Sequence, residues 1–195
     1  MDARRLLRGA GLAVAACAIG VGVARDPRVA GLDRDGFAAL NGGHGPGADR
    51  VFSAVTELGS LYATGAAAVT LAAMGRHREA ARAFAATATT WVVLQGMKKV
   101  VDRPRPLDAS PEGARQLIAR PRGQSWPSSH PAVLTTFSRV VARELGVDAG
   151  GRAALGALDV TVAASRVDLG VHYPSDVISG LLLGRTVAAW WPRGH

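Results

Sequence analysis

The sequence predicts an all-α fold, a bundle of six transmembrane helices with an active site at one membrane face. Apolar residues make up 48% of the 195 positions, and they gather in segments of helical length that polar stretches separate. Many of them are Ala, and together with Gly these small residues permit close helix packing in lipid. A chain of this length forms one domain. We therefore expect a single domain over residues 1–195, with its catalytic core at about 83–191.

The formal net charge is +8, and most of the positive charge comes from arginine. Such a balance suits nucleic acid, anionic lipid or a phosphate substrate. No pattern of an RNA-recognition motif, a zinc finger or a basic zipper is visible, so we expect no nucleic-acid partner. Cys17 is the only cysteine, which excludes an internal disulfide and a cysteine-based metal site. The expected partners are the lipid bilayer and a membrane lipid phosphate, while the oligomeric state is not predicted.

The first apolar segment, residues 9–24, carries no charge and follows a basic start. These features fit a signal peptide. They also fit a retained first helix, somewhat short for the ~20 residues that a span needs, and we expect the helix because further apolar segments follow. Residues 25–50 are polar and rich in Gly, Asp and Arg, with a short interfacial helix expected at 35–40.

The other five spans follow in order along the chain. They are expected at 51–74, 83–97, 131–147, 153–164 and 177–191. An even number of spans places both termini on one side of the membrane. The long loop 98–130 and the stretch 165–176 then share the opposite side, where we expect the chemistry. Trp190 and Trp191 are expected to anchor the last helix at a membrane interface.

Arginines near the termini, and in the turns on the same side, favour a cytoplasmic location for that side. The active site of this multi-pass cell-membrane protein is then expected on the extracytoplasmic face. Because the opposite loops hold at least as many Lys and Arg residues, the count itself leaves the orientation open.

Four charged residues lie inside the predicted spans at a similar depth: Glu57, Arg139, Asp159 and Arg185. An unpaired charge inside a bilayer costs about 2.5–3.5 kcal/mol or more. We therefore expect these charges to pair across the bundle, Arg139 with Asp159 first. A soluble helical bundle is the alternative, which the number and even spacing of the apolar segments disfavour.

The stretch 165–176 places a histidine four residues before a carboxylate. Pro174 fits the first turn of a helix, so His172 and Asp176 lie together at its start. A carboxylate bonded to one ring nitrogen leaves the other nitrogen free to attack an electrophile. Arg166 adds a guanidinium fork that matches phosphate oxygens. A helix-capping Asp beside a surface His is the simpler alternative for this stretch taken alone.

The long loop begins with a second group of charges, Lys98 and Arg105. Two X-Pro steps hold the chain extended here, so that Arg105 turns back toward the Lys98 ammonium. Two converging cations suit a dianionic oxygen cluster. For Lys99 and Arg103 we expect the simpler role of basic residues at a membrane edge, with their charges among lipid headgroups.

A third group lies at the end of the long loop. Pro131 again fits the first turn of a helix, so Ser128 and Ser129 lie at its N-terminal end. Free backbone N–H groups and the helix dipole attract an anion there. His130 is then held beside that anion. A capping pair of serines is common, so this group alone is weak evidence.

The three groups together resemble the three-part signature of the type 2 phosphatidic acid phosphatase superfamily. The matching patterns are Lys-x6-Arg-Pro at 98–106, Pro-Ser-x-His at 127–130 and Ser-Arg-x5-His-x3-Asp at 165–176. The match occupies the C-terminal half, and the six spans are similar to those of the family's integral-membrane branch. Ser129 departs from the family pattern, which often has Gly there, and Pro131 is a second peculiarity.

This resemblance implies a role for each residue. His172 attacks phosphorus and forms a phosphohistidine, Asp176 orients it, and His130 protonates the leaving oxygen and later takes a proton from water. The phosphate oxygens are held by Lys98, Arg105, Ser128, the Ser129 amide and Arg166. Three cations make a divalent metal unnecessary, so no metal and no cofactor is expected.

The favoured function is a membrane lipid phosphatase. Isoprenyl (di)phosphates, such as the undecaprenyl carrier, are expected ahead of phosphatidic acid and phosphatidylglycerol phosphate, because the chain has little beyond the six-helix core. Two other classes stay open. One is a vanadate-dependent haloperoxidase, whose pocket is similar, and the other is a non-enzymatic membrane protein that binds anionic headgroups.

Overall fold

The computed structural model describes residues 3–109 and 114–194, and every regular element in these two ranges is helical. The elements are α1 (Ala3–Arg25), α2 (Pro27–Leu40), α3 (Pro46–Val55), the 3-10 helix η1 (Thr56–Gly59), α4 (Leu61–Ala73), α5 (His77–Val101), α6 (Pro106–Ala109), α7 (Ser129–Glu144), α8 (Ala149–Asp168) and α9 (Pro174–Trp190). The prediction of an all-α fold is confirmed.

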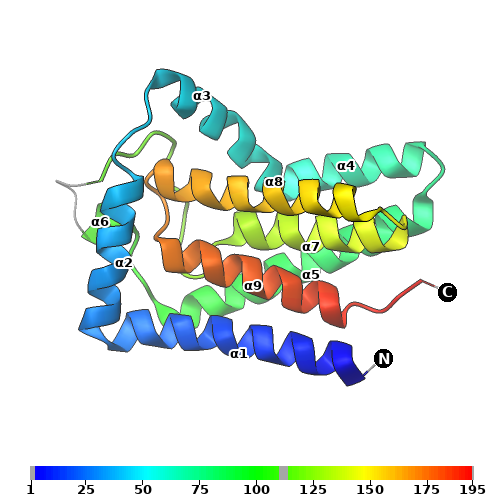
Figure 1. Cartoon of the computed structure of the whole chain (residues 1–195), viewed down its shortest axis with the longest axis horizontal. Helices are drawn as coiled ribbons and strands as arrows, with labels where there is room; N and C mark the ends of the chain where they lie inside the picture. Colours follow the sequence, from blue (N-terminus) through cyan, green and yellow to red (C-terminus); the bar gives the residue numbers. More distant parts are fainter. Residues whose placement is uncertain (1–2, 110–113, 195) are drawn as a thin grey trace.

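Helix α7 is the central rod of the bundle. It contacts α4, α5, α8, α9 and η1, and all its side chains over residues 131–138 are buried. The long helices run side by side, and the two termini lie at the same end of the molecule (Figure 1). The predicted placement of both termini on one side is therefore borne out in the arrangement of the helices.

Small polar side chains tie α7 to its neighbours. The hydroxyl groups of Thr90 in α5 and Thr136 in α7 lie 2.9 Å apart in a hydrogen bond, and Thr136 also donates to the Gly184 carbonyl of α9 at 3.2 Å. A Cβ added to Gly184 would lie 2.5 Å from the Ala132 carbonyl oxygen, so the backbones of α7 and α9 touch at this point. Helices that carry small residues at their contacts approach in this way.

The predicted span at 51–74 is not one helix. The chain forms α3, then η1, and starts again as α4 after Ser60, whose backbone is extended and whose Oγ accepts a hydrogen bond from Ala63 N at 3.0 Å. Thr56 and Gly59 of η1 are buried, and η1 contacts α7 and α8. The prediction was wrong because an apolar run does not reveal a serine cap within it.

Helix α2 is longer than the short helix predicted at 35–40. Pro27 occupies its first turn, and the Asp26 side chain caps it by accepting from Arg28 N at 2.8 Å. Its two buried residues are Asp33 and Phe37. Phe37 packs edge-on against the ring of Tyr173, which docks α2 onto the start of α9.

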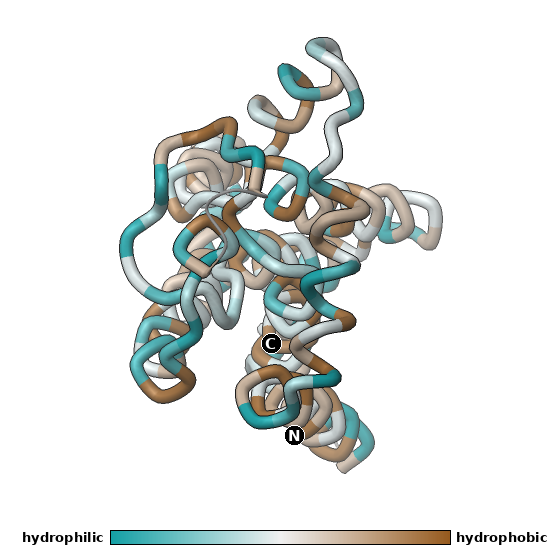
Figure 2. The backbone as a smooth tube through the Cα atoms, turned by 90° about the vertical axis from the view of Figure 1, so that its left-hand side faces the viewer, coloured by the Kyte–Doolittle hydropathy of each residue, from teal (hydrophilic) through white to brown (hydrophobic). Residues whose placement is uncertain are grey.

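By length and composition, α1 is the one helix in the described part of the chain that is apolar enough to cross a membrane. Helix α4 is apolar but shorter. Figure 2 shows hydrophilic and hydrophobic residues mixed along the backbone over much of the end that faces the viewer. Helices thus occur in each predicted segment, and of those in the described ranges α1 alone is both long and apolar enough to cross a membrane.

The predicted pairing of the interior charges was wrong. No ion pair joins Arg139 to Asp159 in the described ranges, where Asp159 instead accepts hydrogen bonds from the Ser138 hydroxyl at 3.1 and 3.3 Å. Glu57 belongs to η1 and is exposed. The Asp159 carboxylate thus bonds the hydroxyl of Ser138, the residue next to Arg139. A prediction based on charge alone does not consider hydroxyl donors.

The α7–α9 contact makes a stability prediction. Gly184→Ala places a methyl group against the Ala132 carbonyl, and overpacking of this kind costs about 1–3 kcal/mol. For a chain of this size we expect the apparent Tm in detergent to fall by roughly 2–10 °C. Gly96→Ala in α5 is the control, because a Cβ there meets nothing within 4 Å. Equal Tm values for the two variants would contradict the close α7–α9 contact.

Candidate active site

The three predicted groups of residues meet at the end of the bundle opposite the termini (Figure 1). Helix α5 and α8 end there, and α7 and α9 begin there. The loop after α5, the start of α7 and the turn between α8 and α9 therefore converge. Residues from all three patterns come together.

A tight turn positions His172. The carbonyl oxygen of Arg166 accepts hydrogen bonds from both Val171 N and His172 N, each at 3.2 Å. Gly170 has a φ of +79°, and a Cβ there would collide with the backbone of Arg115. Only glycine fits both constraints. The turn folds back on α8 and points the imidazole into the protein.

The His172 side chain is 2% exposed and lies between a cation and a carboxylate. Its Nε2 is 3.3 Å from Arg105 Nη1, and its Nδ1 is 3.5 Å from Asp176 Oδ2. The second distance is longer than a good hydrogen bond. Nδ1 has no hydrogen-bond partner among the described residues. Asp176 is thus placed on the Nδ1 side, which leaves Nε2 facing the cations.

The electrostatic surroundings keep His172 neutral. Burial lowers its pKa well below 6.5, and the positive charges of Arg105, Lys98 and Arg166 lower it further. A neutral imidazole retains a lone pair on one nitrogen. At pH 7 the ring is therefore a nucleophile or a hydrogen-bond acceptor rather than a cation.

Lys98 and Arg105 converge as the sequence predicts. Both donate to the Gln124 carbonyl, Lys98 Nζ at 2.8 Å and Arg105 Nη2 at 3.3 Å. Arg105 also donates to the carbonyl of Val171 at 2.8 Å. Both side chains are buried, and burial together with the charge of Arg105 lowers the pKa of Lys98 to about 7. Their hydrogen-bond partners are neutral groups, carbonyl oxygens and the His172 ring, which orient them without supplying a negative charge.

Arg166 adds a third buried cation. It is 2% exposed, its Nη1 donates to Thr56 Oγ1 at 2.9 Å, and its Nε has no hydrogen-bond partner among the described residues. No ion pair to a carboxylate is found for Lys98, Arg105 or Arg166 in the described ranges. Buried charges without a counter-charge are costly. A bound anion would offset that cost.

The start of α7 faces the same cations. Burial lowers the pKa of His130, in the first turn, to about 3, with Arg166, Lys98 and Arg105 contributing to the lowering. The sequence predicts free N–H groups at this helix end, but the Ser128 amide is not one of them. It donates to the Asp176 carbonyl at 3.0 Å. Its hydroxyl is buried without a hydrogen-bond partner. Ser129 begins the helix, so its amide is one of those that α7 leaves without an intrahelical acceptor.

Arg103 is the residue that the sequence interpretation misjudged. It does not lie among lipid headgroups: it is 8% exposed and donates to Asp176 Oδ1 at 2.7 Å and to Asp33 Oδ2 at 2.6 Å. Its guanidinium also stacks over the Tyr173 ring, 4.0 Å from the centroid. Burial opposes its charge, but the two carboxylates outweigh burial and raise the pKa of Arg103.

Asp33 and Ser175 complete this network. Asp33 accepts hydrogen bonds from Ser175 N at 2.9 Å and from Ser175 Oγ at 2.5 Å. Ser125 Oγ donates to Asp176. None of these three residues carries a sequence signal of its own, because their partners lie 51 to 142 positions away. Only the docking of α2 and of the loop reveals them.

Within residues 3–109 and 114–194, no three side chains of the His, Cys, Asp or Glu type converge in a way that could hold a metal ion. The site instead offers three cations, a neutral histidine and the amino end of a helix. That set is suited to an anion with several oxygen atoms.

Fold and site together define an all-helical protein with a cationic, phosphate-type pocket at one end of its bundle. The chain belongs to the PAP2 superfamily, whose family model matches residues 79–195. The match contains all the predicted site residues, from Lys98 to Asp176.

Two relatives are named decaprenylphosphoryl-5-phosphoribose phosphatase. The protein from Mycobacterium tuberculosis is 34% identical over 93 residues, which cover 48% of each chain. The one from Mycolicibacterium smegmatis is 37% identical over 100 residues, 51% of this chain and 49% of its own. The chain thus spans about half the length of the curated relatives that it matches.

Two solved structures share the fold. One is the crystal structure of a transmembrane PAP2-type phosphatidylglycerolphosphate phosphatase from Bacillus subtilis, with a TM-score of 0.76, 20% identity and 92% of both chains covered. The other is LpxE from Aquifex aeolicus, with a TM-score of 0.70, 25% identity, and 78% of this chain and 89% of that chain covered. The first shows similarity of fold alone.

The Arg103 network makes a prediction about stability. Arg103→Leu leaves Asp33 and Asp176 buried without their cation and should lower the free energy of unfolding by about 3–5 kcal/mol. Combining it with Asp33→Asn should cost less than the sum of the two single changes, with a coupling of roughly 0.5–3 kcal/mol. Denaturant unfolding in detergent measures both quantities. Arg34→Leu, at an exposed position of α2, is the control. Strict additivity of Arg103→Leu and Asp33→Asn would contradict the network.

Proposed function

We propose that the protein is an integral-membrane lipid phosphatase that hydrolyses an isoprenyl phosphate or diphosphate through a phosphohistidine, without a metal. One observation carries the proposal. Three buried cations, Lys98, Arg105 and Arg166, surround a buried neutral histidine, and none of them forms an ion pair with a carboxylate in the described ranges. A phosphate dianion supplies the missing charge.

In the first step, His172 Nε2 attacks phosphorus and the bond from phosphorus to the lipid or diphosphate oxygen breaks. Burial and the nearby cations lower the pKa of His130 to about 3, and the charge of the bound phosphate dianion opposes that lowering, so His130 takes up a proton with the substrate. It gives this proton to that oxygen, so the leaving group departs neutral at this atom. The phosphorylated imidazole carries a positive charge and a proton on Nδ1. Asp176, 3.5 Å from Nδ1, stabilises that charge.

During the attack, negative charge spreads over the three equatorial oxygens of the phosphoryl group. Lys98 and Arg105 face these oxygens in orientations that backbone carbonyls fix. Arg166 and the Ser129 amide bind from the other side, and the Ser128 hydroxyl, buried without a hydrogen-bond partner, has its hydrogen-bonding capacity available. Donors that are already oriented need no reorganisation in the transition state.

In the second step, water attacks phosphorus and the phosphorus–nitrogen bond breaks. The neutral His130 left by the first step takes the proton from the water. Inorganic phosphate leaves, His172 returns to its neutral form and His130 is protonated again. The cycle consumes one water molecule and leaves both histidines as they began.

Membrane placement and an isoprenyl substrate are supported by different observations. Helix α1 is apolar enough to span a bilayer, and a structural neighbour is a transmembrane phosphatase. The curated relatives are named for a decaprenylphosphoryl sugar phosphate, so a polyprenyl phosphosugar phosphate is the second candidate substrate. We further propose a single domain over residues 1–195, with its core at about 83–191 and its active site on the extracytoplasmic face.

The experiment that tests the function measures phosphate release by the detergent-purified protein with EDTA present. The substrates are undecaprenyl diphosphate, a polyprenyl phosphosugar phosphate, phosphatidic acid, phosphatidylglycerol phosphate and a soluble sugar phosphate. We expect release from a polyprenyl lipid, and a loss of several orders of magnitude in His172→Ala because the nucleophile is gone. His77→Ala, an exposed histidine near the other end, should stay active.

Three outcomes would change the assignment. Full activity of His172→Ala would overturn the phosphohistidine mechanism. Lipid binding without release from any substrate would favour a non-enzymatic lipid-binding protein. Vanadate-dependent oxidation of halide would favour the haloperoxidase class instead.

The lowered pKa of His172 predicts the acid side of the pH profile. Attack needs the neutral ring, which is present above the pKa and is lost as the pH falls through it. Because the pKa lies below 6.5, kcat/KM should stay high at pH 6.5 and fall only at lower pH. Arg105→Gln removes one of the lowering charges and should move the acid limb upward. An acid limb above pH 7 in the unmodified protein would contradict a neutral His172.

A further inference from the structure

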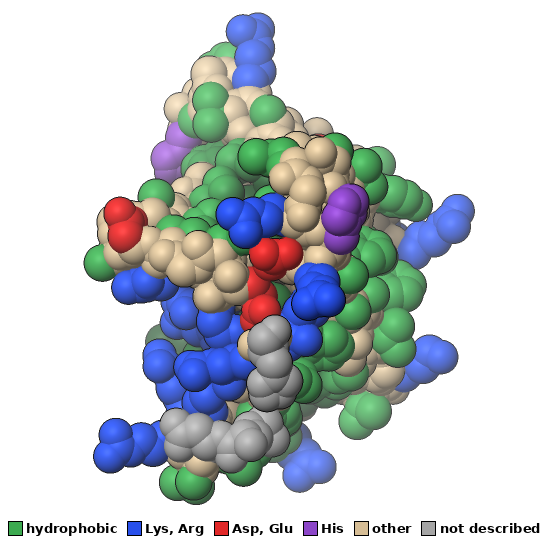
Figure 3. Space-filling model, turned by 90° about the vertical axis from the view of Figure 1, so that its right-hand side faces the viewer, with side chains coloured by type: hydrophobic (Ala, Val, Ile, Leu, Met, Phe, Trp, Pro, Cys, Tyr) green, Lys and Arg blue, Asp and Glu red, His purple; other side chains and the backbone are tan. Residues whose placement is uncertain are grey.

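A second cationic site lies at the other end of the bundle, where the termini are. Figure 3 looks onto this end and shows Lys and Arg side chains gathered over part of it. A cavity of about 230 Å³ opens among them. Its charged lining comes from four parts of the chain: Arg5, Arg8, Arg139, Arg143, Arg185 and Arg193. No carboxylate lines this cavity in the described ranges.

These arginines differ in how they are held. Arg143 donates to Glu144 Oε1 and to the Ala188 carbonyl, so its charge is balanced. Arg139 and Arg185 have no hydrogen bond or ion pair among the described residues, and the Arg185 Nε is buried. Arg185 and Arg8 repel Arg139 electrostatically, and Asp159 attracts it from a distance. Like charges that share a small cavity call for an anion between them.

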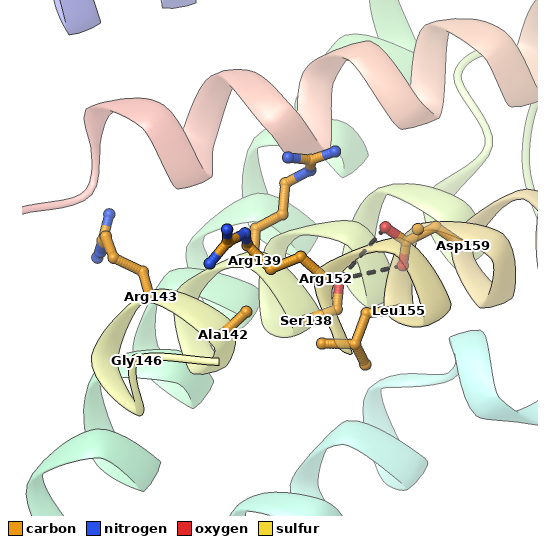
Figure 4. A pocket seen from close by; sticks show the side chains of 9 residues that line it. Ser138, Arg139, Ala142, Arg143, Gly146, Arg152, Leu155 and Asp159 are labelled. Carbon is orange, nitrogen blue, oxygen red and sulfur yellow. Dashed lines mark hydrogen bonds between the residues drawn. The ribbon is translucent and has the colours of Figure 1, made fainter. Parts of the chain in front are cut away.

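The nearest carboxylate inside the bundle does not play that role. In Figure 4 the Asp159 carboxylate faces Ser138, and neither Arg139 nor Arg152 reaches it. Arg139 also lines the neighbouring cavity of about 340 Å³ drawn in that figure. Arg139 is thus a cation between two cavities, attracted by Asp159 in one of them but without a hydrogen bond or ion pair to any described residue.

The surroundings of the cavity indicate a lipid headgroup. The apolar part of the cavity lining consists of Leu12 from α1 and Ala188 and Ala189 from α9. Arg8 lies in the first turns of this helix, where a spanning segment meets the headgroup layer. An anion here has apolar surface next to it for acyl chains.

We propose that this arginine cavity binds the phosphate of an anionic phospholipid in the leaflet opposite the active site. The phosphodiester oxygens lie between Arg139 and Arg185, and the acyl chains begin at the apolar side chains of α1 and α9 that line the cavity. The inference rests on the membrane placement proposed above, but not on the catalytic chemistry. The lipid phosphate adds a negative charge to that of Asp159, which acts on both arginines without forming an ion pair in the described ranges.

The test is lipid retention by native mass spectrometry of the detergent-purified chain. The protein is mixed with equal amounts of phosphatidylglycerol and phosphatidylcholine of the same acyl chains; phosphatidylglycerol is a phosphodiester and not a phosphomonoester substrate. We expect preferential retention of phosphatidylglycerol. The double variant R139Q/R185Q should lose about tenfold or more of that preference, the effect of losing roughly one charge-assisted contact.

The matched control is R76Q/R78Q, which removes the same charge from exposed positions at the same end and should keep the preference. Should R139Q/R185Q not fold, R8Q alone should still weaken retention. An unchanged preference in R139Q/R185Q or, if that variant does not fold, in R8Q would overturn the site. Displacement of the lipid by an equal concentration of inorganic phosphate would overturn the headgroup assignment. Retention is measured in His172→Ala as well, where it should be unchanged even if the proposed enzymatic function fails.

Discussion

The active-site end depends on one buried carboxylate, Asp176 at the start of α9. Its two side-chain oxygens accept hydrogen bonds from Tyr173 N, from Ser125 Oγ and from Arg103, and its backbone carbonyl accepts from Ser128 N. These donors come from the turn before α9, the loop after α5 and the start of α7. A fully buried carboxylate is stable only when its oxygens are satisfied. The hydrogen bonds to Asp176 therefore fix the relative positions of the segments that carry the histidines and the cations.

The other cations nearby have no carboxylate bonded to them in the described ranges. Arg103 is the cation that binds Asp176 and Asp33 directly. Lys98, Arg105 and Arg166 donate to neutral acceptors, and Asp176 acts on Lys98 and Arg105 only from a distance. Burying such charges costs free energy that the folded protein must offset elsewhere. An anionic ligand that binds the folded state alone returns part of that free energy. The site is thus completed by its ligand, which is the property required of a pocket that binds a phosphate dianion.

The sequence predicts some of these features well because their causes are local. The order and spacing of the three motifs, the proline at the start of α9 and the glycine turn before it depend on neighbouring residues, and the helices begin where the prolines indicate. The Arg103–Asp33 contact was not predictable in this way, since the two residues are 70 positions apart and neither belongs to a motif. The break at Ser60 and the pairing of Asp159 with Ser138 were missed for a related reason. In both cases a serine hydroxyl forms the hydrogen bond. A serine hydroxyl changes the pattern of hydropathy and charge along the sequence very little.

Both ends of the bundle carry clustered basic side chains, but these side chains are held differently at the two ends. At the active-site end, carbonyl oxygens of Gln124 and Val171 hold Lys98 and Arg105 in fixed directions within a buried pocket. Fixed donors favour a transition state, because its charge meets dipoles that need not turn. At the opposite end, Arg139 and Arg185 have no such bonds among the described residues and retain their side-chain freedom. Flexible guanidinium groups adapt to a headgroup but gain no advantage for a transition state, so this end is suited to holding an anion rather than to reacting with it.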